Sequence, residues 1–257
     1  MSRKHITFTC AGEQLVGTLD AGECEVGVLI VSGGNEVRSG AFSGQAHLAT
    51  RLAFAGYPVF RFDRRGVGDS TGTNTGFKDS AMDITAALAT FREHVPGLRS
   101  IAGFGICDAA SALMLTRGAG CDALVLANPW VVEDSTALPP PSVIRARYIA
   151  RMRDSGAILR LVSGKVSLRR LLQGVKGALR PTPPPTGLAR DVTRGLASFP
   201  GPVRILLAER DRTAQIFDAI WPKGDPRVFR CPDASHAFAE AKSEDWLFQQ
   251  ILTAISE

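Results

Sequence analysis

Apolar runs of strand length alternate with segments of helical periodicity along most of the 257-residue chain, and no other feature constrains the fold as strongly. The run EVGVLIVSGG ends in two glycines and is typical of a strand buried on both faces of a sheet. It is followed by AHLATRLAFAGY, which has apolar residues at helical spacing and stops near a glycine. This alternation predicts βαβ units, with mainly parallel strands and helices on both faces of one sheet.

Eight strands fit the pattern, and the first two are expected to form an antiparallel edge. The predicted strands occupy residues 5–10, 14–20, 25–34, 58–66, 100–107, 122–130, 203–211 and 227–233. The predicted helices occupy residues 46–57, 79–94 and 108–118, and a further helix follows each of the last two strands. The sequence therefore predicts an α/β fold built on an eight-stranded, mostly parallel sheet.

One long segment interrupts the alternation. From Trp130 to about Arg190 the pattern is helical, and it is closed by the linker PTPPPTG. A long insertion at the carboxyl end of a strand is the usual position of a lid over an active site. We therefore expect a core made of residues 1–130 and 191–257, with an Arg-rich helical lid at 131–190.

The predicted lid carries eleven Arg and Lys against three acidic residues, whereas the net charge of the whole chain is only +5. These cations suit a phosphate-bearing substrate (acyl-CoA or a lipid-linked sugar), peripheral contact with an anionic membrane, or a solvated helical face. Arg145 and Arg147 are the candidate substrate contacts. Nucleic acid is not expected as a partner, because no recognised binding motif accompanies the charge.

Cysteine spacing and hydropathy exclude several other classes. The five cysteines are scattered without a CxxC pair, which indicates neither a metal site nor a disulfide framework. The glycine-rich turns match neither a Walker pattern nor GxGxxG, and no cofactor is expected. No apolar run approaches the length of a membrane span. We expect a cytoplasmic protein, with peripheral contact at the inner membrane face as an option, and the oligomeric state is left open.

Cys107 lies where a buried strand gives way to a helix, in GFGICDAA. A nucleophile elbow is a sharp, strained turn that needs small residues two before and two after the nucleophile, and Gly105 and Ala109 occupy those places. The N-terminus of the following helix favours a thiolate. The alternative is that Cys107 is a buried structural thiol, which is a common fate of free cysteines.

The order of the other polar groups supports a catalytic triad. In elbow enzymes the acid and then the histidine follow the nucleophile along the chain. Of the four histidines only His236, in a loop after the last strand, satisfies that order. Asp211 ends the preceding strand and is the favoured acid, with Glu209 as its alternative. The acid would fix the imidazole tautomer and stabilise the imidazolium.

Two backbone N–H groups are needed to stabilise the oxyanion that forms during acyl transfer. One is expected from Asp108, the residue after the nucleophile, and the other from Gly34 or Asn35 in the loop after an early strand. Gly33 and Trp130 are expected in the substrate pocket, although Trp130 is equally consistent with core packing. The turn at residues 63–70, DRRGVGDS, is interpreted as a structural turn that shapes the floor of the site.

Two motifs resemble a known family. DRRGVGDSTG resembles the D-x-R-G-x-G-x-S turn of α/β hydrolases, and GFGICDAASA with ANPW resembles the exosortase A system-associated hydrolase 1 family of bacteria. The resemblance covers essentially the whole chain, including the Arg-rich segment. It implies an α/β-hydrolase fold, a cysteine where most relatives have serine, and a role near exopolysaccharide or surface-protein processing. It carries the nucleophile onto Cys107 and the histidine onto His236.

These observations predict a cysteine-dependent acyl hydrolase of the esterase or thioesterase type, acting on a small-molecule substrate through an acyl-Cys107 thioester. One alternative is an acyltransferase that passes the acyl group to a sugar or lipid. Another is a binding protein that has kept the scaffold without its chemistry.

Overall fold

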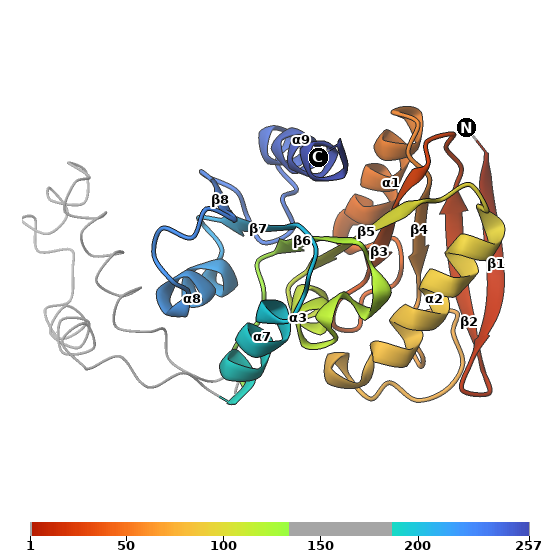
Figure 1. The fold of residues 1–257 in the computed structure, drawn as a ribbon, viewed down its shortest axis with the longest axis horizontal. Helices are drawn as coiled ribbons and strands as arrows, with labels where there is room; N and C mark the ends of the chain where they lie inside the picture. The colour runs from red at the N-terminus through yellow and green to blue at the C-terminus, as the bar shows by residue number, and fades with distance from the viewer. Residues whose placement is uncertain (1, 134–186, 257) are drawn as a thin grey trace, which may run out of the picture.

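A computed structural model describes residues 2–133 and 187–256 of the chain. Its centre is an eight-stranded sheet in the order β1-β2-β4-β3-β5-β6-β7-β8 (Figure 1). The strands are β1 Arg3–Cys10, β2 Glu13–Asp20, β3 Val26–Val31, β4 Val59–Phe62, β5 Ser100–Ile106, β6 Ala123–Ala127, β7 Val203–Ala208 and β8 Val228–Cys231. β1 and β2 are antiparallel to their neighbours, and β3 to β8 are parallel. The predicted antiparallel edge is thus confirmed.

Helices cover both faces of the sheet. They are α1 Gly44–Phe54, α2 Ala81–His94, α3 Asp108–Leu115, α7 Gly187–Ala197, α8 Arg212–Ile220 and α9 Ala241–Ser256, with short 3-10 helices η1 Ala41–Ser43, η2 Phe77–Asp79 and η3 Arg117–Gly120. α2, α3, α7 and α8 contribute to one hydrophobic cluster, and α1 and α9 to the other. Figure 1 shows α1 and α9 together on one side of the sheet.

The pleat of the parallel strands explains why their sequences are continuously apolar. Along β3, Leu29 and Val31 pack into the first cluster, whereas Val28 and Ile30 pack into the second. All four side chains are fully buried. Because successive side chains point to opposite faces of a strand, a strand covered on both faces needs apolar residues at every position.

The end of the predicted lid falls inside a core helix. α7 begins at Gly187, four residues before the expected return to the core at 191, and its residues Leu188 and Ala189 are buried in the first hydrophobic cluster. Val131, at the other predicted boundary, is buried there as well. The rest of the predicted lid, with Arg145 and Arg147, lies outside the described residues. No helix in the described part of the chain is long and apolar enough to cross a bilayer.

Candidate active site

Cys107 stands on a strained turn between β5 and α3. Its backbone has φ 62° and ψ −123°, a conformation that L-residues rarely adopt. Its N–H donates to the carbonyl of Ala127 at 2.9 Å, which ties the turn to the end of β6. A Cβ on Gly105 would lie 2.8 Å from backbone atoms of Ala109 and Ala110. The structure thus shows why a sharp elbow requires glycine at position 105.

His236 and Asp211 come together at the carboxyl ends of the last two strands. The imidazole Nδ1 lies 3.0 Å from Oδ1 of Asp211, whose side chain is only 9% exposed. The other carboxylate oxygen, Oδ2, accepts the N–H of Ala214 at 2.8 Å and so caps the N-terminus of α8. Of the two acids left open by the sequence, it is Asp211 that contacts the imidazole, and Glu209 is exposed.

Hydrogen bonds to Asp211 and then to Cys107 raise the pKa of His236 to about 10, against the opposing effect of burial. The imidazole is therefore protonated at neutral pH. With Nδ1 held by Asp211, Nε2 is the ring nitrogen left for Cys107. The three residues predicted as a triad are therefore adjacent in space.

Asn128 holds the histidine loop and was not singled out from the sequence. It is fully buried just after β6, with φ 46°. Its Nδ2 donates to the carbonyl of His236 at 2.9 Å, while its Oδ1 accepts the N–H of Ala208 at 2.8 Å. One side chain thus joins the ends of β6 and β7 to the histidine. The available signal was an asparagine directly after a strand, because asparagine tolerates positive φ better than most residues.

The oxyanion-hole candidates are arranged unexpectedly. The N–H of Gly34 points at the carboxylate of Asp108, with both oxygens 2.7 Å from the nitrogen. The side chain of Asn35 instead accepts a hydrogen bond from Asn74 at 2.7 Å. From this loop, Gly33, Gly34 and Glu36 line the cavity next to Cys107.

The cavity has a volume of about 400 Å³ and opens over Cys107 and His236. Much of its wall is apolar, formed by Phe42, Leu48, Phe77, Phe104, Ile106, Trp130, Phe238 and Leu247. The ionisable side chains on the described wall, apart from the nucleophile, are Glu36, His47, Asp108, His236 and Glu244. A pocket of this size and composition suits a small, largely apolar acyl group.

Trp130 takes both of the roles left open for it, because it lines this cavity and packs against the first hydrophobic cluster. Its backbone N–H also donates to the carbonyl of Cys107 at 3.2 Å.

Two ionisable residues of the cavity were missed or misread from the sequence. His47, one of the three histidines set aside because of its place in the chain, lies on the cavity wall. Desolvation raises the pKa of Glu36, and the positive charge of His236 opposes that rise. Neither residue belongs to a recognisable motif. The other two histidines make local contacts, His5 with Thr18 at 3.1 Å and His94 with the carbonyl of Thr90 at 2.9 Å.

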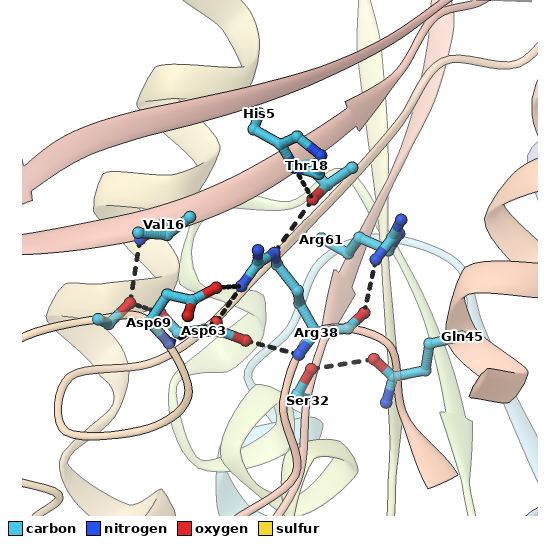
Figure 2. A network of polar contacts seen from close by, with 10 residues as sticks. His5, Val16, Thr18, Ser32, Arg38, Gln45, Arg61, Asp63 and Asp69 are labelled. Atoms are coloured by element: carbon cyan, nitrogen blue, oxygen red, sulfur yellow. Dashed lines mark hydrogen bonds and ion pairs between the residues drawn. The ribbon is translucent and has the colours of Figure 1, made fainter. Parts of the chain in front are cut away.

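A buried polar network fixes the loop between β3 and α1, and Figure 2 shows its members gathered around Arg38 of that loop. Asp63, at the end of β4, is fully buried and forms an ion pair with Arg38 of the loop. It also accepts the backbone N–H groups of Arg38 at 2.6 Å and Asp69 at 3.1 Å. The predicted structural role of the turn at residues 63–70 thus has a physical basis in these contacts.

The next residue of that turn, Arg64, supports the loop from the other side. It is 3% exposed, and its Nη2 donates to the carbonyl of Gly34. Burial lowers the pKa of Arg64, while the nearby carboxylates of Asp108 and Asp83 oppose that effect. The turn therefore positions the same glycine that faces the nucleophile.

Within residues 2–133 and 187–256, no group of three or more His, Cys, Asp or Glu side chains is placed to hold a metal ion.

Comparisons with known proteins agree with this architecture. A family model described as "Alpha/beta hydrolase family" matches residues 28–249. A search of curated proteins found no match.

Among solved structures, an esterase from Pyrococcus furiosus is 18% identical, with a TM-score of 0.62, covering 99% of this chain and 92% of that one. A thermophilic esterase from Thermogutta terrifontis is 18% identical, with a TM-score of 0.58 and 97% of each chain covered. A thioesterase domain from the curacin biosynthetic pathway is 13% identical, with a TM-score of 0.56, covering 98% of this chain and 100% of that domain. At these identities the likeness is one of fold.

Proposed function

Because this chain belongs to the alpha/beta hydrolase family, we propose that it is a cysteine-dependent acyl hydrolase that cleaves small-molecule esters or thioesters. The observation that carries the proposal is that Cys107 and His236 line one cavity, with Nδ1 of the imidazole 3.0 Å from the carboxylate of Asp211 behind it. A nucleophile, a base within reach of it and an acid that orients the base are the parts that acyl transfer needs.

The first half-reaction would form an acyl-enzyme. The sulfur of Cys107 attacks the carbonyl carbon of the substrate, and the π electron pair moves onto the carbonyl oxygen. Backbone N–H groups of Asp108 and Gly34 are the proposed donors to that oxyanion. When the oxyanion collapses, the bond to the leaving group breaks, and His236 gives its Nε2 proton to the departing oxygen or sulfur. The acyl group is then held on Cys107 as a thioester.

The second half-reaction would return the enzyme. Neutral His236 accepts a proton from water as the water oxygen attacks the thioester carbon. Collapse of this second oxyanion releases the carboxylic acid and leaves the thiolate of Cys107 beside an imidazolium. The raised pKa of His236 keeps the imidazole protonated in the resting enzyme. Esters and thioesters suit the mechanism better than amides, because thiolate is itself a good leaving group.

The resemblance to the exosortase A system-associated hydrolase 1 family supports a setting near bacterial exopolysaccharide or surface-protein processing. The wall of the described cavity is largely apolar, which supports an apolar acyl group as part of the substrate. We also propose that the leaving group bears a phosphate, which Arg145 and Arg147 would contact.

The test is hydrolysis of p-nitrophenyl butyrate, combined with intact mass measurement of the protein after rapid quenching. We expect turnover and a butyryl adduct on Cys107. Cys107→Ala should lose both, with a fall in rate of roughly a thousandfold or more. Cys24→Ser is the matched control, because Cys24 is also partly exposed but is not one of the residues that line the cavity. Absence of both turnover and adduct, also with butyryl-CoA as substrate, would overturn the proposal.

A further inference from the structure

The side chain of Asp108 folds back onto the loop that faces the nucleophile. Both of its carboxylate oxygens lie 2.7 Å from the nitrogen of Gly34. Asp108 directly follows Cys107 and opens helix α3, so the carboxylate is tethered next to the reacting sulfur. A negatively charged oxygen therefore already accepts the N–H that the proposed mechanism reserves for the oxyanion of the substrate.

The fit between the carboxylate and the loop is close. A Cβ placed on Gly33 would lie 2.4 Å from Oδ1 of Asp108, so no larger residue fits at position 33 while the carboxylate stays where it is. Gly34 itself has φ 52°, a left-handed conformation in which glycine is the least strained residue. Gly33 is thus matched to the presence of this carboxylate, and Gly34 to the backbone turn of the loop.

Of the two loop residues considered as donors, Gly34 lines the cavity, whereas Asn35 is not among the residues that line it. A carboxylate resembles both the oxyanion and the acid that ester hydrolysis releases, in its charge and in its hydrogen-bond acceptors.

We propose that the carboxylate of Asp108 is a built-in competitor for the oxyanion hole, so that a substrate forms its oxyanion only by displacing this side chain from the N–H of Gly34. This inference rests on the proposed acyl-hydrolase function and deepens it. It makes Asp108 a specificity-determining residue, because an activated carbonyl displaces the carboxylate more readily than an unactivated one.

The positive charge of Arg64 would stabilise the carboxylate of Asp108 after its displacement. Its guanidinium is buried against the carbonyl of Gly34, and its charge attracts Asp108. In the described part of the chain, Nε of Arg64 has no hydrogen-bond partner. A carboxylate that leaves the N–H of Gly34 therefore moves within the field of an incompletely paired buried cation. This lowers the cost of vacating the hole.

The test compares two reactions of the same sulfur. Acylation by p-nitrophenyl butyrate forms the carbon–sulfur bond through an oxyanion and needs the hole. Alkylation by iodoacetamide forms the carbon–sulfur bond as iodide leaves, and no oxyanion arises. The ratio of the two second-order rate constants therefore reports on the hole and cancels changes in the nucleophilicity of Cys107. Reversible inhibition by butanal gives a second reading, because addition of the sulfur to the aldehyde carbon moves the π electron pair onto an oxygen in the hole.

For Asp108→Ala we expect the acylation-to-alkylation ratio to rise roughly tenfold and the inhibition constant of butanal to fall by a similar factor, because a charge-assisted competitor is removed. Asp108→Asn keeps the shape and an oxygen acceptor but not the charge, and should show a smaller rise. It also covers the case in which Asp108→Ala does not fold. Glu36→Gln is the matched control. It removes another carboxylate of the cavity without releasing the N–H of Gly34, so both rate constants should change by one factor.

An unchanged or lower ratio in both Asp108 variants, together with unchanged or weaker butanal inhibition, would overturn the inference while leaving the acyl hydrolase intact. Failure of the proposed function looks different. In that case neither the wild type nor any variant turns over the ester or carries an acyl adduct on Cys107, even though iodoacetamide still alkylates it.

Discussion

Asp211 divides its two carboxylate oxygens between different partners. Oδ1 faces Nδ1 of His236, and Oδ2 caps helix α8 through the N–H of Ala214. The hydrogen bond from Ala214 to Oδ2 holds the carboxylate in one orientation, and that orientation aims Oδ1 at the imidazole. A glutamate could make either contact, but its longer chain would not present both from the same backbone position. The helix N-cap is thus also the acid that we propose orients the imidazole.

The charge state of His236 provides the prediction at this scale. Because Asp211 is the largest cause of the raised pKa, Asp211→Asn should bring the midpoint of the His236 titration down from about 10 towards the ordinary 6.5. NMR of the imidazole Cε1–H signal measures the midpoint directly. Glu209→Gln is the control, because the neighbouring acid is exposed. A midpoint that stays near 10 in Asp211→Asn would contradict the assigned contact.

The same shift makes stability depend on pH. The folded-state pKa of His236 lies above its unfolded value, so its contribution is complete below pH 6.5 and is lost as the pH rises towards about 10. The free energy of unfolding of the wild type should therefore approach that of Asp211→Asn over this window. Urea unfolding at pH 6 and pH 10 measures the gap, which should narrow; a gap that widens would contradict the sign.

At the scale of elements, the site is a set of loops at the carboxyl ends of neighbouring parallel strands. β5 presents Cys107, β7 leads to Asp211, and β8 leads to His236. β6 contributes no reacting group. Asn128, which directly follows β6, instead bonds to Ala208 at the end of β7 and to the backbone carbonyl of His236. The register of four adjacent strands therefore sets the distances within the triad.

Removing the side chain of Asn128 should impair catalysis more than substrate binding. In Asn128→Gly the positive φ is retained without strain, so the variant isolates the lost side chain. It leaves the buried N–H of Ala208 without its acceptor, which costs about 1–3 kcal/mol of unfolding free energy. We expect kcat for p-nitrophenyl butyrate to fall about tenfold or more, with a small change in KM. Asn128→Ala, which adds backbone strain, should be less stable again. An unchanged kcat in Asn128→Gly would contradict the positioning role.

The sequence predicted the elements, and which residues would meet as a candidate triad, for definable reasons. Strands buried on both faces are continuously apolar, and the order of nucleophile, acid and histidine leaves His236 as the single candidate base. The roles of Asn128, Glu36 and the carboxylate of Asp108 could not be predicted, because they depend on contacts between segments far apart in the chain. Gly34 and Asp108, for instance, are separated by 74 positions. Nothing local to either residue indicates that they meet.

At the scale of the whole molecule, the site depends on a buried ionic network that joins the sheet to the loop before α1. Asp63 compensates the charge of Arg38, and the carbonyl of Arg38 in turn accepts Nη1 of Arg61 at 3.1 Å. A buried ion pair contributes little net stability when it is complete, but losing one partner leaves a buried charge uncompensated. The network therefore fixes the conformation of the loop.

Asp63→Asn should accordingly lower the free energy of unfolding by about 3 kcal/mol, the lower end of the range for a broken buried pair, because Arg38 keeps its contact with Asp69. The chain provides a close control, because Asp69 bonds to the same Nη1 of Arg38 with a side chain that is 69% exposed. Asp69→Asn should cost about 1 kcal/mol or less. Urea unfolding of both variants measures the difference, and equal losses would contradict the argument from burial.

The order of the triad along the chain has a consequence for biosynthesis. Cys107 leaves the ribosome well before Asp211, and His236 emerges close to the end of the described chain. A nascent chain therefore carries the thiol of Cys107 before Asp211 and His236 have been added. Under the proposed function, acyl-adduct formation needs all three residues in place. Released, refolding protein should accordingly gain the adduct only when β7 and β8 have docked onto the sheet.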